Sequence, residues 1–446
     1  MAGLGNFAAD YKSSLWRKGC LLRSFLSGRI IQNTGALYLV QISGYIAPLL
    51  ILPYLARVLG TSSYGQFATL QAIVAYGLVL TDYGFLLSGT RKIASLRETG
   101  DHIGGVYKNI TAARLLLACT AFAAMMAIAE FMPHVKLNLT LISAILVIVV
   151  SNALTPLWFF QGLQRMSIIG IVVLFSRIFS VLLTYVLVRS SADMALALWS
   201  QSLGTALACL FCLWYAARLL SVLDAQNYRV TWKGIREELL DGWHIFQSMF
   251  FSALLTNTGV LILGLYAAPS VVGGYAVVER VGKGVASLLT PFTQAIYPRI
   301  SAAFARSTVE GLRMVGTWAK RLAFPTLGLV FMLILIHYSG TIGIVFGSEY
   351  QVYSDALLIL IPWILLGVVN NFLGIQIMTN IGEQAWYSKA FTVSALVSIA
   401  ISFMFSGIYS YRAIAAALVL GETSLTLLLI YRLRTVFLAK KEGYKI

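Results

Sequence analysis

Apolar stretches of about twenty residues, separated by short polar gaps, recur along the whole of this 446-residue chain. A helix of that length spans the roughly 30 Å hydrocarbon layer of a bilayer. Hydrophobic residues make up 59% of the positions and charged residues only 11%, so the chain cannot cover itself with a soluble surface. The sequence therefore predicts an all-α, polytopic membrane protein.

The apolar stretches predict about twelve transmembrane helices, in two bundles of six. The helices are expected near residues 34-56, 66-88, 110-131, 139-160, 168-188, 194-217, 243-266, 273-297, 322-337, 355-378, 389-407 and 413-431. The chain then divides into a cytoplasmic amphipathic segment at 1-33, a six-helix bundle at 34-218, a cytoplasmic linker at 219-242, a second six-helix bundle at 243-431 and a basic cytoplasmic tail at 432-446.

The basic residues between the predicted helices fall mainly on one side of the membrane. With the N-terminus placed inside, the inward segments hold 25 Lys and Arg residues and the outward gaps hold 4. Cytoplasmic loops of membrane proteins carry the excess of Lys and Arg. This bias predicts that both termini are cytoplasmic.

A weak internal repeat relates the two predicted bundles. Shifting the chain by 208 residues places Gly65-Gln66-Phe67-Ala68 on Gly273-Gly274-Tyr275-Ala276, at corresponding ends of the second and eighth helices. Two halves of six helices have the same topology, so the repeat is parallel, about an axis along the membrane normal. Two such bundles predict a central cavity that opens alternately to each side, which is a transporter architecture.

Several short segments resemble the polysaccharide transporter family, which contains the Wzx-type O-antigen flippases. They are WFFQGLQRM at 158-166, Leu59-Gly60 with Tyr64-Gly65, and Asp82-Tyr83-Gly84 with Arg91-Lys92-Ile93-Ala94. One departure is Gln164, where the family often has an acidic residue. The resemblance implies a MATE-like fold and translocation of an undecaprenyl-pyrophosphate-linked oligosaccharide to the periplasmic leaflet of the bacterial inner membrane. It also implies a polysaccharide polymerase and a chain-length regulator as partners.

Cations inside predicted helices are candidates for binding such a substrate, because ions deep in a bilayer are costly unless they face protein or water. Arg177 lies near the middle of the fifth helix, and Arg280 and Lys283 lie in the eighth. Glu279 is four residues from Lys283 and is expected to pair with it, which leaves a surplus cation on that face. We expect Arg177, Arg280 and Lys283 to bind the pyrophosphate, the alternative being that they pair between helices. Arg114, close to a helix end, is expected to snorkel to the interface.

Two intramembrane carboxylates, Asp82 and Glu422, are candidates for coupling transport to an ion gradient. A carboxylate that meets Arg177 or Arg280 in only one state of the cavity would hold its proton differently in the two states. Unequal affinity for two states is what shifts their equilibrium. The alternative is passive transport down a substrate gradient.

The sequence argues against several other kinds of site. The stretch at 282-284 lacks the Ser or Thr of a phosphate-binding loop, so no nucleotide cofactor is expected. The four histidines lack metal-ligand spacing, so no metal is expected. The C-x-x-C at Cys209 and Cys212 is expected to pack helices. The net charge of +16 is spread over loops, so nucleic acid is not an expected partner.

Two other functions remain as alternatives. A multidrug antiporter of the same superfamily would prefer a more acidic cavity for organic cations. The surplus charge inside the predicted membrane helices of this chain is instead cationic. A membrane enzyme, such as an O-antigen polymerase or ligase, needs a sizeable outward loop for acceptor sugars. The longest outward gap, at 338-354, offers little room. We therefore expect a transporter rather than an enzyme.

Overall fold

A computed structural model describes residues 28–99, 102–223 and 229–441. Within these ranges all regular secondary structure is helical, with no strand, and every predicted helix falls on a helical segment. The predicted all-α, polytopic fold class is confirmed. Most of the predicted amphipathic segment at 1-33, together with Cys20 and the last residues of the basic tail, lies outside the described residues.

The first half of the chain forms seven α-helices and one turn of 3-10 helix. They are α2 (Gly28–Asp82), α3 (Phe85–Thr99), α4 (Gly104–Glu130), α5 (Leu139–Leu154), α6 (Leu157–Gly162), α7 (Met166–Leu187), η1 (Ser191–Asp193) and α8 (Met194–Leu223). The second half forms nine α-helices and a π-helical segment. They are α9 (Trp232–Tyr266), α10 (Pro269–Ser287), α11 (Thr290–Arg306), α12 (Thr308–Tyr338), α13 (Thr341–Phe346), α14 (Ser348–Gln351), α15 (Asp355–Asn370), the π-helix η2 (Asn371–Met378), α16 (Gln384–Tyr409) and α17 (Tyr411–Lys441).

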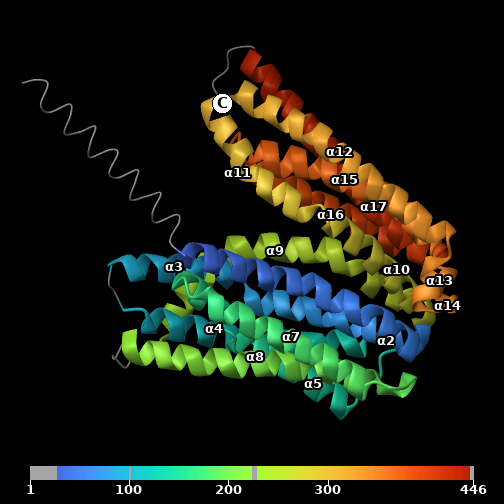
Figure 1. The fold of residues 1–446 in the computed structure, drawn as a ribbon, viewed down its shortest axis with the longest axis horizontal. Coiled ribbons are helices and arrows are strands. Elements are labelled where there is room, and N and C mark those ends of the chain that lie inside the picture. Colours follow the sequence, from blue (N-terminus) through green and yellow to red (C-terminus); the bar gives the residue numbers. More distant parts are fainter. Residues whose placement is uncertain (1–27, 100–101, 224–228, 442–446) are drawn as a thin grey trace, which may run out of the picture.

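Local backbone chemistry explains where the first helices break. Gly60 interrupts α2 with a φ of 68° and a ψ of 171°, a conformation that glycine adopts without steric cost. Figure 1 shows α2, in blue, turning back on itself at this point. Thr155, which precedes Pro156, is extended, because the proline ring disfavours a helical conformation in the residue before it. The predicted helix at 139-160 is therefore divided into α5 and α6.

The prediction of one continuous helix at 273-297 is wrong. The helix is interrupted by a turn at Leu288 and Leu289, whose backbone dihedrals stay near helical values, and α11 begins at Thr290 with Pro291 in its first turn. Proline clashes with the carbonyl group four residues before it but fits the first turn of a helix. The residue four positions before Pro291 is Ser287, which explains why α10 ends there.

Nine helical stretches among the described residues are long and apolar enough to cross a membrane, or ten if the bent pair in α9 counts as one span. The stretch from Pro48 to Thr99 is counted once, although its 52 residues contain the Gly60 break, the predicted span at 66-88 and the end of the predicted span at 34-56. The multi-pass membrane character is therefore clear, and the number twelve stays a prediction.

The helices form two groups that meet at one end of the molecule and diverge at the other. Figure 1 shows α2 to α8 in one group, with α9 and α10 lying against it, and α11, α12, α15, α16 and α17 in the second group. The groups are joined near α10, α13 and α14, and they are farthest apart near α11 and α3. α9 packs against α2 and α4 and also against α16 and α17.

The end at which the groups meet is closed by hydrogen bonds formed by Arg57, Thr61, Glu349 and Tyr350. We call them the outer latch, after the side of the membrane on which the predicted topology places them. The Arg57 guanidinium donates to backbone carbonyl oxygens of α13, one of them 2.7 Å from Nε. The Glu349 carboxylate accepts from the Thr61 backbone N–H at 3.1 Å and from its hydroxyl at 3.4 Å. The Tyr350 hydroxyl donates to a backbone carbonyl of α2 at 2.9 Å. The latch therefore joins the two halves of the chain.

The two segments related by the sequence repeat lie against each other next to the latch. A side chain on Gly65 would overlap the backbone of Pro269 and approach that of Gly273. A side chain on Gly273 would in turn overlap the backbone of Thr61. Only glycine permits this contact between α2 and α10, and a two-fold axis between the halves would bring equivalent residues together in this way.

Candidate transport cavity

A cavity of about 820 Å³ lies inside the first group of helices, where α9 and α10 cover it. Most of its lining comes from α2 to α8, and the central cavity expected between the two bundles stays a prediction. Polar and charged side chains that line it are Tyr64, Gln71, Asp82, Arg114, Asn152, Thr155, Ser176, Arg177, Ser180, Gln201, Thr205, Arg280, Lys283 and Ser287. The remaining lining is largely aliphatic.

The cavity is elongated along the second half of α2. Tyr64 and Asp82 both line it and are 18 residues apart on that helix. A rise of 1.5 Å per residue converts this separation to about 27 Å. Tyr64 follows Thr61 of the outer latch by three residues, and Asp82 is the last residue of α2, next to α3, which Figure 1 shows at the end where the two helical groups diverge.

Arg280 lies at the latch side of the cavity and contacts neutral side chains. Its guanidinium donates to the Tyr64 hydroxyl at 2.6 Å and to the Gln71 side-chain oxygen. It also lies over the Tyr64 ring, 5.6 Å from the ring centroid, in a cation–π contact. The predicted pair on the same helix is present, since Lys283 Nζ lies 3.0 Å from Glu279 Oε1.

Arg177 reaches the cavity from α7 and lies against Gly44 in the first half of α2. A side chain on Gly44 would come within 2.8 Å of an Arg177 guanidinium nitrogen, so the glycine leaves room for the cation. The structure therefore brings Arg177, Arg280 and Lys283, predicted from the sequence as substrate-binding, to the wall of one cavity. With Arg114 they make four cations against the single carboxylate of Asp82 in the described lining.

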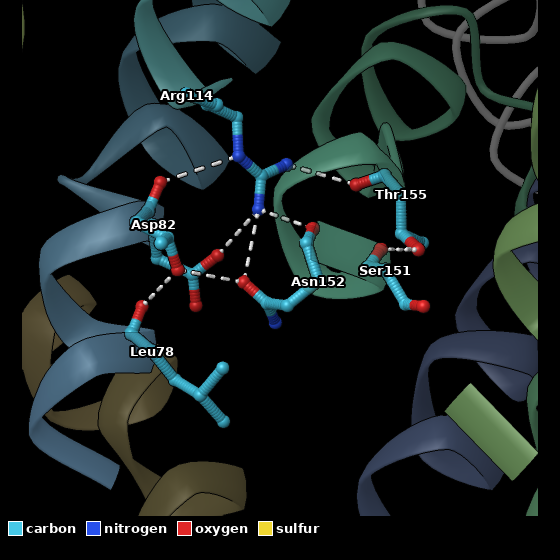
Figure 2. Close-up of polar contacts among 7 residues, drawn as sticks. Leu78, Asp82, Arg114, Ser151, Asn152 and Thr155 are labelled. Carbon is cyan, nitrogen blue, oxygen red and sulfur yellow. Dashed lines mark hydrogen bonds and ion pairs between the residues drawn. The ribbon is translucent and has the colours of Figure 1, made fainter. Parts of the chain in front are cut away.

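The prediction that Arg114 snorkels to the membrane interface is wrong. Its side chain is only 5% exposed, and its Nη2 lies 2.7 Å from Asp82 Oδ1, as Figure 2 shows. Asp82 was expected to meet Arg177 or Arg280, and in this structure its cationic partner is Arg114. The Asp82 side chain is 38% exposed and lines the cavity.

Arg114 also joins the ends of two helices that stop inside the protein. Its guanidinium donates to the backbone carbonyl oxygens of Thr81, Asn152 and Thr155 at 3.3, 2.9 and 2.8 Å. These carbonyls lie at the C-terminal ends of α2 and α5, where intrahelical partners run out. An arginine, with five N–H donors in one plane, can satisfy several of them at once. The hydrogen bonds fan out from one guanidinium in Figure 2.

Glu422 does not line the cavity. It lies in α17, only 9% exposed, and its carboxylate and its backbone oxygen both accept hydrogen bonds from the Asn370 side chain. Thr426 donates to the other side of the Asn370 amide at 2.8 Å. Of the two carboxylates predicted to couple transport to ions, only Asp82 faces the cavity.

Sequence reasoning missed the neutral polar residues of the site, which are Tyr64, Gln71, Asn152 and Gln201. Tyr64 directly precedes the repeated segment and belongs to a motif that resembles the family, which was a usable signal, whereas uncharged amides in an apolar helix gave none. Cys209 and Cys212 are buried free thiols, and no group of three or more metal-binding side chains occurs among the described residues.

Comparison with known proteins identifies the family. The family described as polysaccharide biosynthesis protein matches residues 30–304. Over 407 residues, the chain is 28% identical to a protein of Escherichia coli (strain K12) named "Putative O-antigen transporter", covering 90% of this chain and 96% of that one.

Two solved structures share the fold. A lipid II flippase in an inward closed conformation matches with a TM-score of 0.68 at 12% identity, covering 91% of this chain and 87% of that one. An inward-facing multidrug resistance MATE family transporter matches with a TM-score of 0.67 at 16% identity, covering 91% and 99%. These relatives are transporters and flippases rather than enzymes, as expected for this chain. Since the family match spans more than half of its length, the chain belongs to the polysaccharide biosynthesis protein family.

Proposed function

We propose that this protein is a flippase for a lipid-linked oligosaccharide whose head group is anionic. In its most specific form, the proposal is that the substrate is an undecaprenyl-pyrophosphate-linked O-antigen repeat unit. The protein would move it from the cytoplasmic to the periplasmic leaflet of the bacterial inner membrane by alternating access. Family membership, the transporter fold and the E. coli relative support a flippase. The charge of the cavity supports an anionic substrate.

The observation that carries the proposal is the environment of Arg280. This cation lines the cavity, its hydrogen bonds go to the neutral Tyr64 and Gln71 side chains, and it forms no ion pair with any described carboxylate. A cation held away from bulk water without a counter-charge is costly. A phosphate oxygen would supply the missing charge, and the planar guanidinium matches a phosphate with two parallel donors. Arg177 and Lys283 would add to this attraction.

The position of the outer latch, taken together with the predicted topology, supports this direction of transport. The latch contains Arg57 and Glu349, which fall in gaps predicted to face outward. If that orientation holds, the cavity is closed toward the periplasm and the helical groups diverge toward the cytoplasm. This is the arrangement that an inward-facing transporter needs to accept a lipid-linked saccharide made in the cytoplasm.

Proteoliposomes containing the purified protein test the proposal. The protein should move a polyprenyl-pyrophosphate oligosaccharide between leaflets, and the Arg280→Ala, Lys283→Ala double variant should do so much more slowly. Arg280→Lys should retain part of the rate, because it keeps the charge. Arg306→Ala is a matched control, since Arg306 is exposed and pairs with Glu310 outside the cavity. Wild-type rates from the double variant would reassign both cations to helix pairing, and uptake of organic cations in place of the lipid would indicate a multidrug antiporter.

A further inference from the structure

A chain of hydrogen bonds runs from Arg280 across α2 to α8. Arg280 donates to the side-chain oxygen of Gln71, and Gln71 Nε2 donates to Gln201 Oε1 at 3.1 Å. All three residues line the cavity. These two hydrogen bonds therefore connect Arg280 on α10, at the latch side of the cavity, to the neutral amide of Gln201 on α8.

The chemistry of the three groups fixes the direction of this chain. A guanidinium has donors only, so Gln71 must present its oxygen to Arg280 and its NH₂ group to Gln201. Gln201 must then accept the hydrogen bond from Gln71 with its side-chain oxygen. Its NH₂ group is left available to donate to another acceptor. Gln201 Nε2 makes no hydrogen bond with any described residue. Arg280 thus orients Gln201 as a donor toward the cavity.

Gln201 lies on α8, which packs against α7, the helix that carries Arg177. Gly204, one helical turn along α8, lies so close to α7 that a side chain on it would come within 2.8 Å of the Ser176 carbonyl and of Ser180. Ser176 is the neighbour of Arg177 in sequence, and Ser176, Arg177 and Gly204 all line the cavity. The free donors of Gln201 therefore lie in the wall of a cavity that Arg177 and the α10 cations also line.

We infer that Gln201 is a substrate-binding residue that donates a hydrogen bond to an oxygen of the anionic phosphate group, and that Gln71 is the positioning residue that orients it. This inference rests on the proposed function and adds a neutral, directional contact to the three cations. The contact extends the anion site across the cavity from α10 to α8. A structural link between α2 and α8 would need only the hydrogen bond to Gln71 and would place no demand on Gln201 Nε2.

Binding to the purified full-length protein in detergent tests the inference, with a polyprenyl pyrophosphate and the neutral polyprenol of the same chain length as probes. Gln201→Leu should weaken pyrophosphate binding about ten- to hundredfold, the range for a hydrogen bond to a charged group, and leave polyprenol binding unchanged. Gln201→Glu, which replaces the donor by a negative charge, should bind the pyrophosphate still more weakly. Gln201→Lys should restore affinity because it supplies a donor again. Gln71→Leu should give a smaller loss than Gln201→Leu.

The control and the contrary outcomes separate this inference from the proposed function. Gln66→Leu changes an amide on α2 that does not line the cavity and should bind both probes like the wild type. Wild-type affinity in Gln201→Leu and Gln201→Glu, with a loss in Arg280→Ala, would overturn the role of Gln201 alone. An affinity of Gln201→Lys as low as that of Gln201→Leu would also overturn it and indicate a packing role. A wild-type protein that binds the two probes equally would overturn the proposed function and this inference together.

Discussion

Weakening the outer latch should shift the protein toward a state that is open at the latch end. The change we consider is the double variant Glu349→Ala, Tyr350→Phe. Glu349 accepts two hydrogen bonds from Thr61, the first residue after the Gly60 break, where a carboxylate also meets the positive end of a helix. Removing it should cost about 2 kcal/mol, and loss of the Tyr350 hydroxyl hydrogen bond about 1 kcal/mol more. A total of about 3 kcal/mol corresponds to a roughly hundredfold change in the closed-to-open ratio.

Distance measurements between paired spin labels would detect this change. Labels at Ser62 and Ser348, both exposed and on opposite sides of the latch, report its opening in a background without the native cysteines. The wild type should give one short distance, and the double variant should add a longer one. Glu310→Ala, which breaks an exposed ion pair between the end of α11 and the start of α12, should leave the distances unchanged. A distance distribution in the double variant identical to the wild type would refute the role given to the latch.

Three further predictions concern topology, the buried arginine and ion coupling. A single cysteine at Ser190 should react with an impermeant thiol reagent from outside the cell and one at Ser307 should not; the reverse would refute the predicted orientation. Arg114→Ala should lower the free energy of unfolding by about 3 kcal/mol, since it leaves a carboxylate and helix-end carbonyls without their donor, and thermal unfolding in detergent would show whether this loss occurs. If proton movement drives transport through the cavity carboxylate, an imposed pH gradient should change the flipping rate in the wild type and in Glu422→Gln but not in Asp82→Asn. A wild-type rate that is insensitive to the gradient in both directions would exclude proton coupling.

Apolar patterning was sufficient to predict the helices because lipid leaves a spanning backbone few alternatives to helix. The Glu279–Lys283 pair was also predictable, since both residues lie on one helix and depend only on its local geometry. The same patterning missed the interruption between α10 and α11. Pro291 is a helix-breaking signal in the sequence, but the residues around it are apolar enough that 273-297 was predicted as one membrane-spanning helix.

The role of Arg114 could not be predicted from its position in one helix. Its partners are backbone carbonyl groups at the ends of α2 and α5 that lack an intrahelical partner. The helix breaks that leave them without one involve Gly84 and Pro156. Each break has a sequence signal, but only tertiary packing shows that the two breaks meet beside Arg114. The Gln71 to Gln201 contact is similar, since it joins residues 130 positions apart that carry no charge. Sequence patterns within one helix contain no information about such pairs.

The central claim, that this protein moves an anionic lipid-linked saccharide out of the cytoplasmic leaflet, is tested most directly by the lipids of cells that lack it. The lipid-linked saccharides of the inner leaflet should be extracted and compared with those of cells carrying the wild-type protein or the Arg280→Ala, Lys283→Ala variant. We predict that a polyprenyl-pyrophosphate oligosaccharide accumulates in the cytoplasmic leaflet without the protein and with the variant, and that the wild type clears it. An unchanged inner-leaflet pool in cells that lack the protein would contradict the account.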